Sequence, residues 1–187
     1  LHDYSINFDL VKLIGVNRLT YGIETTYNIL NSSTFFENIE TNEIYGGLNR
    51  YPTDGTTMNT FSAYATFKWL TTPRFIVNAG VRYDFLMSKS QFDSSQIHLD
   101  FNEIKYQIGS PSASLCIDYL PFSGFQASFL GSTSTHLPIV DDYGKIMVKD
   151  FIVMVPNNQL LPERSYKVEL GLSQTFFESF RIKASVF

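Results

Sequence analysis

Residues 75–87 read FIVNAGVRYDFLM, and this stretch decides how the chain folds. Apolar and aromatic residues stand at every second position from Phe75 to Met87, whereas the positions between them from Asn78 to Asp84 are polar or small. A period of two places successive side chains on opposite faces of a β-strand. The alternation therefore predicts a strand with one apolar face and one polar face.

The same alternation returns along the chain, in segments rich in β-branched and aromatic residues. Residues 18–30, for example, place Tyr21 and Ile23 on one face and Gly22 and Glu24 on the other. Several segments reach or exceed the roughly 9–11 residues that a tilted strand needs to cross a bilayer. No segment shows a helical period. Eight strands are predicted, near residues 4–13, 18–30, 59–70, 74–87, 105–119, 125–131, 165–177 and 180–187.

The connections between these segments alternate in length. Short connections lie at 14–17, 71–73, 121–124 and 178–179, and long ones at 31–58, 88–104 and 132–164. Every second connection of an antiparallel meander lies at the same edge, so one edge carries tight turns and the other carries long loops. Outer-membrane barrels are built in this way. The sequence thus predicts an all-β fold, an antiparallel meander that forms part of a transmembrane outer-membrane β-barrel, with about eight strands present.

The composition supports a barrel wall whose two faces contact different environments. Hydrophobic residues make up 44% and aromatic residues 16% of the chain, yet the mean hydropathy is −0.04. Lipid outside and water or polar groups inside explain this combination. Aromatic residues also gather near the predicted strand ends, where the interfacial girdle of a membrane barrel lies. They are Tyr4, Phe67, Trp69, Phe85, Tyr119, Phe122, Phe125, Phe176, Phe177 and Phe180.

Several classes of protein are excluded or disfavoured. The net charge is −4 and no Lys/Arg cluster is present, so the chain lacks the basic patch that is typical of nucleic-acid-binding proteins. Cys116 is the single cysteine, which excludes an internal disulfide framework, and no apolar run is long enough for a transmembrane helix. His2, His98 and His136 lie far apart, and no Gly-x-Ser-x-Gly elbow or phosphate-binding loop is present. We therefore expect no catalytic centre, no metal site and no cofactor, and hence no enzyme.

Residues 156–172 read PNNQLLPERSYKVELGL, which resembles a stretch late in the barrel of TonB-dependent receptors. That stretch has an Asn/Pro-rich loop end, then Leu-x-Pro-Glu, a Ser, and a strand with Glu-Leu-Gly. Upstream, residues 135–142 keep a proline of the family, but His136 stands where an arginine is expected. Residues 19–24 and 78–84 also resemble strands of this family. The matching motif residues are Pro138, Leu161, Pro162, Glu163, Ser165, Glu169 and Gly171.

This resemblance implies that residues 1–187 are a partial TonB-dependent receptor β-barrel domain, roughly a third of a barrel of about 22 strands. The plug domain, the remaining strands and the TonB-contacting box lie outside the chain. It also implies a place in the bacterial outer membrane. The implied partners are the lipid bilayer, a plug domain in the same full-length protein and the TonB energy-coupling complex. The implied function is uptake of a scarce solute, such as a siderophore, a cofactor or an oligosaccharide.

The two longest loops carry aromatic and charged residues that suit a polar small molecule or an oligosaccharide. The candidate ligand-binding residues are Tyr45, Arg50, Tyr51, His136, Asp141, Asp142 and Tyr143. Residues of these types are equally common in any solvent-exposed loop.

Two alternative functions stay open at this stage. One is a self-contained eight-stranded outer-membrane barrel with a structural or adhesive role, because eight strands close a small barrel. The other is a soluble all-β carbohydrate-binding module. Strand-like patterns already run at Leu1 and still run at Phe187, so we expect the chain to be part of a longer protein.

Overall fold

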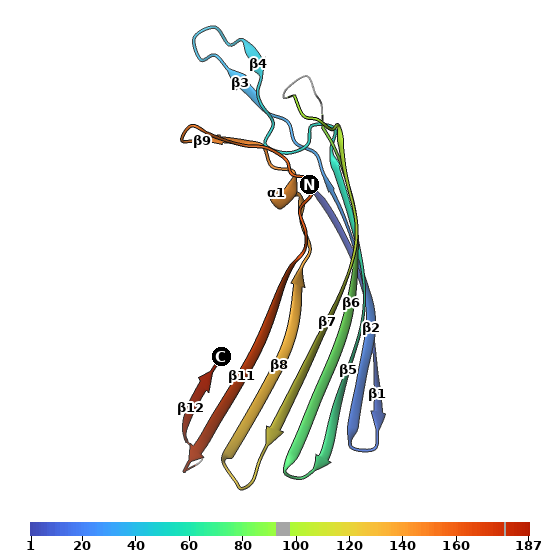
Figure 1. The fold of residues 1–187 in the computed structure, drawn as a ribbon, viewed down its shortest axis with the longest axis vertical. Helices are drawn as coiled ribbons and strands as arrows, with labels where there is room; N and C mark the ends of the chain where they lie inside the picture. The colour runs from blue at the N-terminus through green and yellow to red at the C-terminus, as the bar shows by residue number, and fades with distance from the viewer. Residues whose placement is uncertain (93–97, 178) are drawn as a thin grey trace.

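The computed structural model describes residues 1–187 apart from 93–97 and 178. Its main feature is one antiparallel sheet of eight strands that follow one another as a meander (Figure 1). The strands of this sheet are β1 (His2–Ile14), β2 (Asn17–Leu30), β5 (Thr56–Thr72), β6 (Phe75–Gln91), β7 (Glu103–Tyr119), β8 (Phe125–His136), β11 (Glu163–Phe176) and β12 (Phe180–Val186). The long loops contain β3 (Phe35–Glu37), β4 (Ile44–Gly46), α1 (Val140–Tyr143), β9 (Met147–Lys149) and β10 (Ile152–Met154).

The eight predicted strands are confirmed, but several run further toward the long loops than predicted. β5 begins at Thr56, β6 ends at Gln91 and β8 ends at His136, so the loops between the sheet strands are shorter than expected. The continuation of β6 is hidden in the sequence because its outer positions after Met87, which are Lys89 and Gln91, are polar, so the apolar face stops there. On the inner face Ser88 and Ser90 keep the polar pattern, but both are buried under a loop.

The connections sort by length as predicted, with the tight turns at one end of the sheet and the long loops at the other (Figure 1). The turn between β1 and β2 has only two residues. Its first residue, Gly15, has a φ of +61°, which a two-residue hairpin loop requires and a glycine adopts without strain. Two predicted connections lie partly outside the described residues, the short one at Glu178 and the long one at 93–97.

The two faces of the sheet differ in chemistry along the predicted register. On the outer face Val81 is 61% exposed and Tyr83 stands beside it on β6. On the inner face the guanidinium of Arg82 donates to Glu24 Oε2 at 3.0 Å and to Asp84 Oδ1 at 2.8 Å. The inner face therefore carries paired charges while the outer face is apolar and aromatic.

Glycine on the inner face makes room for side chains from neighbouring strands. A Cβ at Gly22 would lie 2.6 Å from the carbonyl oxygen of Phe8 and 2.7 Å from the hydroxyl oxygen of Tyr64. The Tyr64 hydroxyl passes over Gly22 and donates to Asp9 on β1. Gly22 thus makes room for a hydrogen bond that joins β5 to β1 across β2.

Aromatic rings meet at the end of the sheet that carries the tight turns. Phe75 and Tyr119 stack with their centroids 4.6 Å apart, and Phe122 and Phe125 stack at 5.1 Å. Stacked pairs of this kind add to the stability gained from burial of the rings. Tyr119, Phe122 and Phe125 are residues of the predicted aromatic girdle, and the two stacked pairs lie beside the tight turns β5–β6 and β7–β8.

The sheet is open, because β1 and β12 are its edges. No pairing joins β1 to β12 among the described residues, so this chain is not the self-contained eight-stranded barrel. No second large sheet packs against the first in the described parts of the chain, so a soluble sandwich is not observed either. Across those same residues, no helix has the length and apolarity needed to cross a membrane.

The register leads to a matched pair of substitutions on β6. Val81→Arg places a charge on the outer face and should destabilise the assembled full-length barrel by about 2–4 kcal/mol if that face lies in lipid near the midplane. Asn78→Arg places the same charge on the inner face and should cost much less. Urea-induced unfolding in lipid vesicles measures both. Equal losses from the two substitutions would contradict the assignment of the faces.

Candidate functional site

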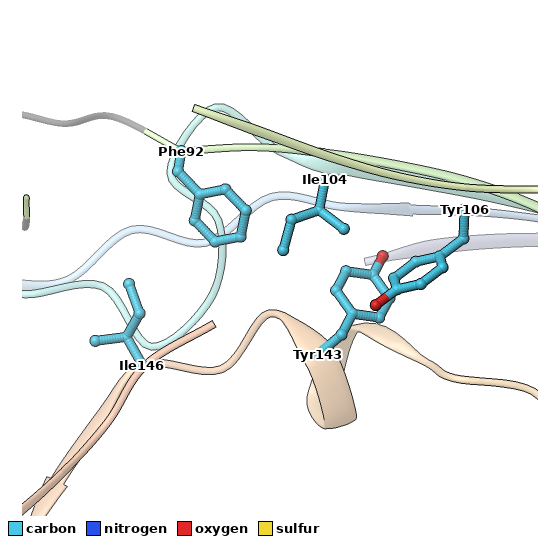
Figure 2. Close-up of a cluster of buried hydrophobic side chains, with 5 residues drawn as sticks. All are labelled: Phe92, Ile104, Tyr106, Tyr143 and Ile146. Carbon is cyan, nitrogen blue, oxygen red and sulfur yellow. The ribbon is translucent and has the colours of Figure 1, made fainter. Parts of the chain in front are cut away.

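The described residues form one buried hydrophobic cluster, and it lies at the loop end of the sheet, on the inner face. Its members come from the ends of β6 and β7 and from the long loop between β8 and β11 (Figure 2). They are Phe92, Ile104, Tyr106, Tyr143 and Ile146. The loop at 137–162 therefore does not hang free in solvent but packs back onto the wall.

Tyr143 holds this loop in place. Its side chain has 0% exposure, its hydroxyl lies 3.0 Å from Ser90 Oγ, and it also bonds the hydroxyl of Ser88. The centroids of its ring and the ring of Tyr106 are 4.9 Å apart. Figure 2 draws both side chains in this cluster. The Tyr106 hydroxyl in turn donates to the carbonyl of Asn157 at 3.1 Å. Because both tyrosine hydroxyls have hydrogen-bond partners, these bonds offset the cost of removing the hydroxyls from water.

Asp141 joins the two longest loops. The Tyr51 hydroxyl donates to Asp141 Oδ1 at 2.6 Å, Arg50 Nη2 lies 3.7 Å from the same oxygen, and Lys145 Nζ lies 3.3 Å from Oδ2. The backbone adds a further link, because the Ile146 amide donates to the Arg50 carbonyl at 2.7 Å. The loop after β2 and the loop after β8 thus meet at a mixed-charge cluster, which we define as Arg50, Tyr51, Asp141 and Lys145.

These contacts shift two titrating groups. The hydrogen bond from Tyr51 lowers the pKa of Asp141 below its ordinary value, and Lys145 and Arg50 act in the same direction. The same hydrogen bond raises the pKa of Tyr51 above its ordinary value. The bond therefore persists over the whole range in which the carboxyl is ionised and the phenol is protonated.

A second pair lies beside this cluster. His136 Nε2 is 3.1 Å from Asp142 Oδ2, and the same carboxylate oxygen accepts from the Ile139 amide at 3.0 Å. His136 ends β8 and Asp142 lies in α1, so the pair closes the turn between strand and helix. Both side chains keep solvent-exposed surface.

The predicted ligand-binding residues therefore lie in four different places. Arg50, Tyr51 and Asp141 come together, and His136 pairs with Asp142, all at the loop end. Tyr143 is buried and acts as a packing residue. Tyr45 lies on the exposed β3–β4 hairpin, where its hydroxyl bonds Glu43, whose pKa this bond lowers.

Sequence reasoning missed the residues that complete this arrangement. Lys145 is one of them, and its position four residues after Asp141 is the signal that would have found it. Tyr106, Ser88 and Ser90 gave no signal, because they lie on strands and meet Tyr143 only in the folded protein.

The motif residues shared with the resembled family have structural positions. Pro138 is fully buried at the start of the long loop, and Glu163 is opposite His136 where β11 pairs with β8. Ser165 bonds Ser134 at 2.7 Å. Leu161 is exposed and precedes Pro162 at the loop end, Glu169 bonds Lys167 at 2.6 Å, and a Cβ at Gly171 would meet the Ser128 hydroxyl at 2.6 Å.

The chemistry available to this arrangement is binding by hydrogen bonds and charge. No group of three or more His, Cys, Asp or Glu side chains is placed to hold a metal ion in the part of the chain that the structure describes. Exposed carboxylates, an arginine, a histidine and tyrosines face the same end of the sheet.

The family model described as "TonB dependent receptor-like, beta-barrel" matches residues 2–187. The chain belongs to this family. The match covers every strand of the sheet, so this TonB-dependent receptor chain consists of barrel wall and loops throughout. No curated protein sequence matches the receptor chain.

Solved structures share its fold. The structure titled "Copper transporter OprC" gives a TM-score of 0.74 at 11% identity and covers 93% of the receptor chain. The siderophore receptor PiuA from Acinetobacter baumannii gives 0.64 at 16% identity over 98% of it, and the ferric-catecholate import receptor Fiu from K12 E. coli gives 0.68 at 12% over 98%. The receptor chain spans 28%, 31% and 30% of these three proteins.

The anchoring tyrosine gives the first prediction from this site. Tyr143→Phe removes the hydroxyl and leaves Ser88 and Ser90 without their shared partner, which should weaken docking of the loop by about 1–3 kcal/mol. Hydrogen exchange of amides in residues 140–160 of the full-length receptor should become faster. Tyr45→Phe on the exposed hairpin is the control and should leave this exchange unchanged. Unchanged exchange in Tyr143→Phe would contradict the anchoring role.

The link between Tyr51 and Asp141 gives a second prediction. The folded pKa of Asp141 is depressed, so the link stabilises the loops above the unfolded pKa and is lost as the pH falls through the lowered folded pKa. Tyr51→Phe should raise the pKa of Asp141 toward the ordinary aspartate value, and Asp141→Asn should lower the pKa of Tyr51. Carboxyl NMR and ultraviolet titration of the full-length receptor measure the two shifts. A pKa of Asp141 that does not move would contradict the hydrogen bond as its main cause.

Proposed function

We propose that this chain forms part of the wall of an energy-coupled outer-membrane transporter that takes up a scarce solute. The observation that carries this proposal is the sorting of the connections, with tight turns at one end and long, packed loops at the other. Outer-membrane barrels have short turns on the periplasmic side and long loops on the outer side, where the solute arrives.

The wall has the chemistry that such a barrel needs. In a bilayer every backbone amide and carbonyl of a lipid-facing strand has to be paired, which only a closed barrel achieves with strands. The outer face, with Val81 and Tyr83, suits lipid, and the inner face, with Arg82, Glu24 and Asp84, suits a polar lumen. The open edges at β1 and β12 are then where the remaining strands of the full-length barrel pair.

The loops supply the site for solute capture. The exposed Arg50 and the half-buried Tyr51 and Asp141 lie together, and His136 and Asp142 lie next to them. Side chains of both charges with aromatic neighbours suit a polar solute such as a siderophore, a cofactor or an oligosaccharide. Tyr45 on the β3–β4 hairpin offers a further contact. The buried Tyr143 positions these groups without touching the solute.

Energy coupling belongs to the full-length protein. A plug domain inside the barrel and the TonB complex on the side of the tight turns are its proposed partners, and the bacterial outer membrane is its proposed location. The wall then encloses the plug mechanically and keeps the lumen polar while the plug moves.

Uptake by cells tests the function directly. A strain that lacks the full-length receptor should take up at least one of three labelled solutes, a ferric siderophore, cobalamin or an oligosaccharide, at least tenfold more slowly than its parent. The loss should be matched by deletion of the TonB gene in the parent. Unchanged uptake of all three solutes, or uptake that does not need TonB, would overturn the proposal as stated for these solute classes.

A loop variant tests the capture site. Asp141→Asn removes the carboxylate that joins the loops and should reduce uptake at low solute concentration by several-fold, with less effect at saturation. Asp54→Asn is the matched control, since Asp54 lies exposed in the same loop as Arg50 and outside the cluster. Equal uptake by the two variants would remove Asp141 from the site.

A further inference from the structure

The wall contains a fork between β7 and β8. Pairing between these strands begins at Tyr119 opposite Ala127 and ends at Ala113 opposite Thr133. On either side the ladders continue further, because β6 pairs with β7 as far as Gln91 opposite Glu103, and β8 pairs with β11 as far as His136. The strands therefore part above Ala113, and the loop-side half of β7 has no described partner on that side.

Pro111 explains why the ladder stops there. The Ala113 amide faces β8, since it donates to the Thr133 side-chain oxygen at 3.0 Å. Amides alternate between the two sides of a strand, so the nitrogen of Pro111, two residues on, faces β8 as well. Proline has no N–H to donate, which makes this position suited to an unpaired edge. The missing donor at Pro111 thus accounts for the end of the ladder between β7 and β8.

A cavity of about 690 Å³ lies at the fork. This volume falls within the roughly 300–1,000 Å³ of ligand-binding clefts. Most of its lining belongs to the outer face of the sheet. Ala63, Ala65 and Ala113 provide small apolar side chains, and Tyr83 and Tyr166 stand beside them. Tyr166 is 74% exposed, so the cleft is open on the outer face.

Arg164 gives the cleft a charge at its loop-side end. It lines the cavity and is exposed, and no carboxylate pairs with it among the residues described by the structure. An apolar cleft with one unpaired arginine at the end nearest the loops is complementary to an amphiphile. Its tail would lie over the alanines, and its anionic head would meet the guanidinium.

We propose that this cleft is a binding site for a membrane lipid with an anionic headgroup, bound with its headgroup at Arg164 and its acyl chain over Ala65 and Ala113. The inference rests on the proposed function, which places the outer face in lipid. If the outer face lies in lipid, the unpaired backbone of β7 requires polar partners, because open sheet edges are not tolerated against bare hydrocarbon. A polar headgroup region at the fork offers partners to the unpaired backbone of β7.

The test uses the full-length receptor in nanodiscs of phosphatidylcholine that contain a small fraction of phosphatidylglycerol. Native mass spectrometry after release should find phosphatidylglycerol retained on the barrel well above its share of the disc. Arg164→Ala should reduce this retention at least fivefold, and Arg164→Lys should keep most of it. Lys149→Ala is the control, since Lys149 is an exposed loop cation away from the cleft. Ala65→Phe, which fills the cleft, should reduce retention of the lipid whatever its charge.

The outcomes separate the two proposals. Insertion is scored first, by the heat-dependent electrophoretic migration of a folded barrel. A receptor that does not insert overturns the proposed function and the lipid site together. A receptor that inserts but retains phosphatidylcholine and phosphatidylglycerol alike, or whose retention is the same in Arg164→Ala and Lys149→Ala, overturns the lipid site alone.

Discussion

Backbone pairing in a fixed register between neighbouring strands is the constraint on which the rest of this structure depends. A single-residue slip in any ladder would move every side chain of that strand to the opposite face. Because the register holds across five strands, Asn7, Glu24, Ser62, Asp84 and Ser110 lie in one row on the inner face. That row creates the charged network around Arg82, and the same register keeps the outer face apolar. The register also explains the glycine at position 22, because the Tyr64 hydroxyl passes over this position to reach Asp9.

The features that suggest function lie where this pairing ends. Beyond the loop ends of the strands the backbone needs other partners, and the loop at 137–162 finds them by packing onto the inner face through Tyr143 and Tyr106. This packing also brings Asp141 to Tyr51. The contacts that satisfy the loop backbone therefore form the mixed-charge cluster as well. At the fork the reason differs. Pro111 removes a donor in the middle of a long strand, and the wall parts into a cleft whose chemistry differs from that of both the lumen and the loops.

Much of the fold was predictable from the sequence, whereas the site was predictable only in part. The period of two in residues 75–87 and its repeats gave the strands, their faces and the sorting of the loops, because these depend on neighbours in the chain. Side-chain chemistry alone also indicated several candidate ligand-binding residues that the fold brings to the loop end of the sheet. They are Arg50, Tyr51, His136, Asp141 and Asp142. The burial of Tyr143 was not predictable, since its partners Ser88 and Ser90 lie more than fifty residues away along the chain.

The sequence by itself determined which residues form strands, which side of each strand is apolar, where the chain turns, and that the chain belongs with the TonB-dependent receptor barrels. These properties follow from local periodicity and turn chemistry, which need no distant contact. Only the tertiary structure decided that a long loop is anchored to the wall, that Asp141 joins two loops, and that β7 and β8 part above Ala113. Each of these depends on residues far apart in sequence that meet only after the strands are in register, and no local pattern records such meetings.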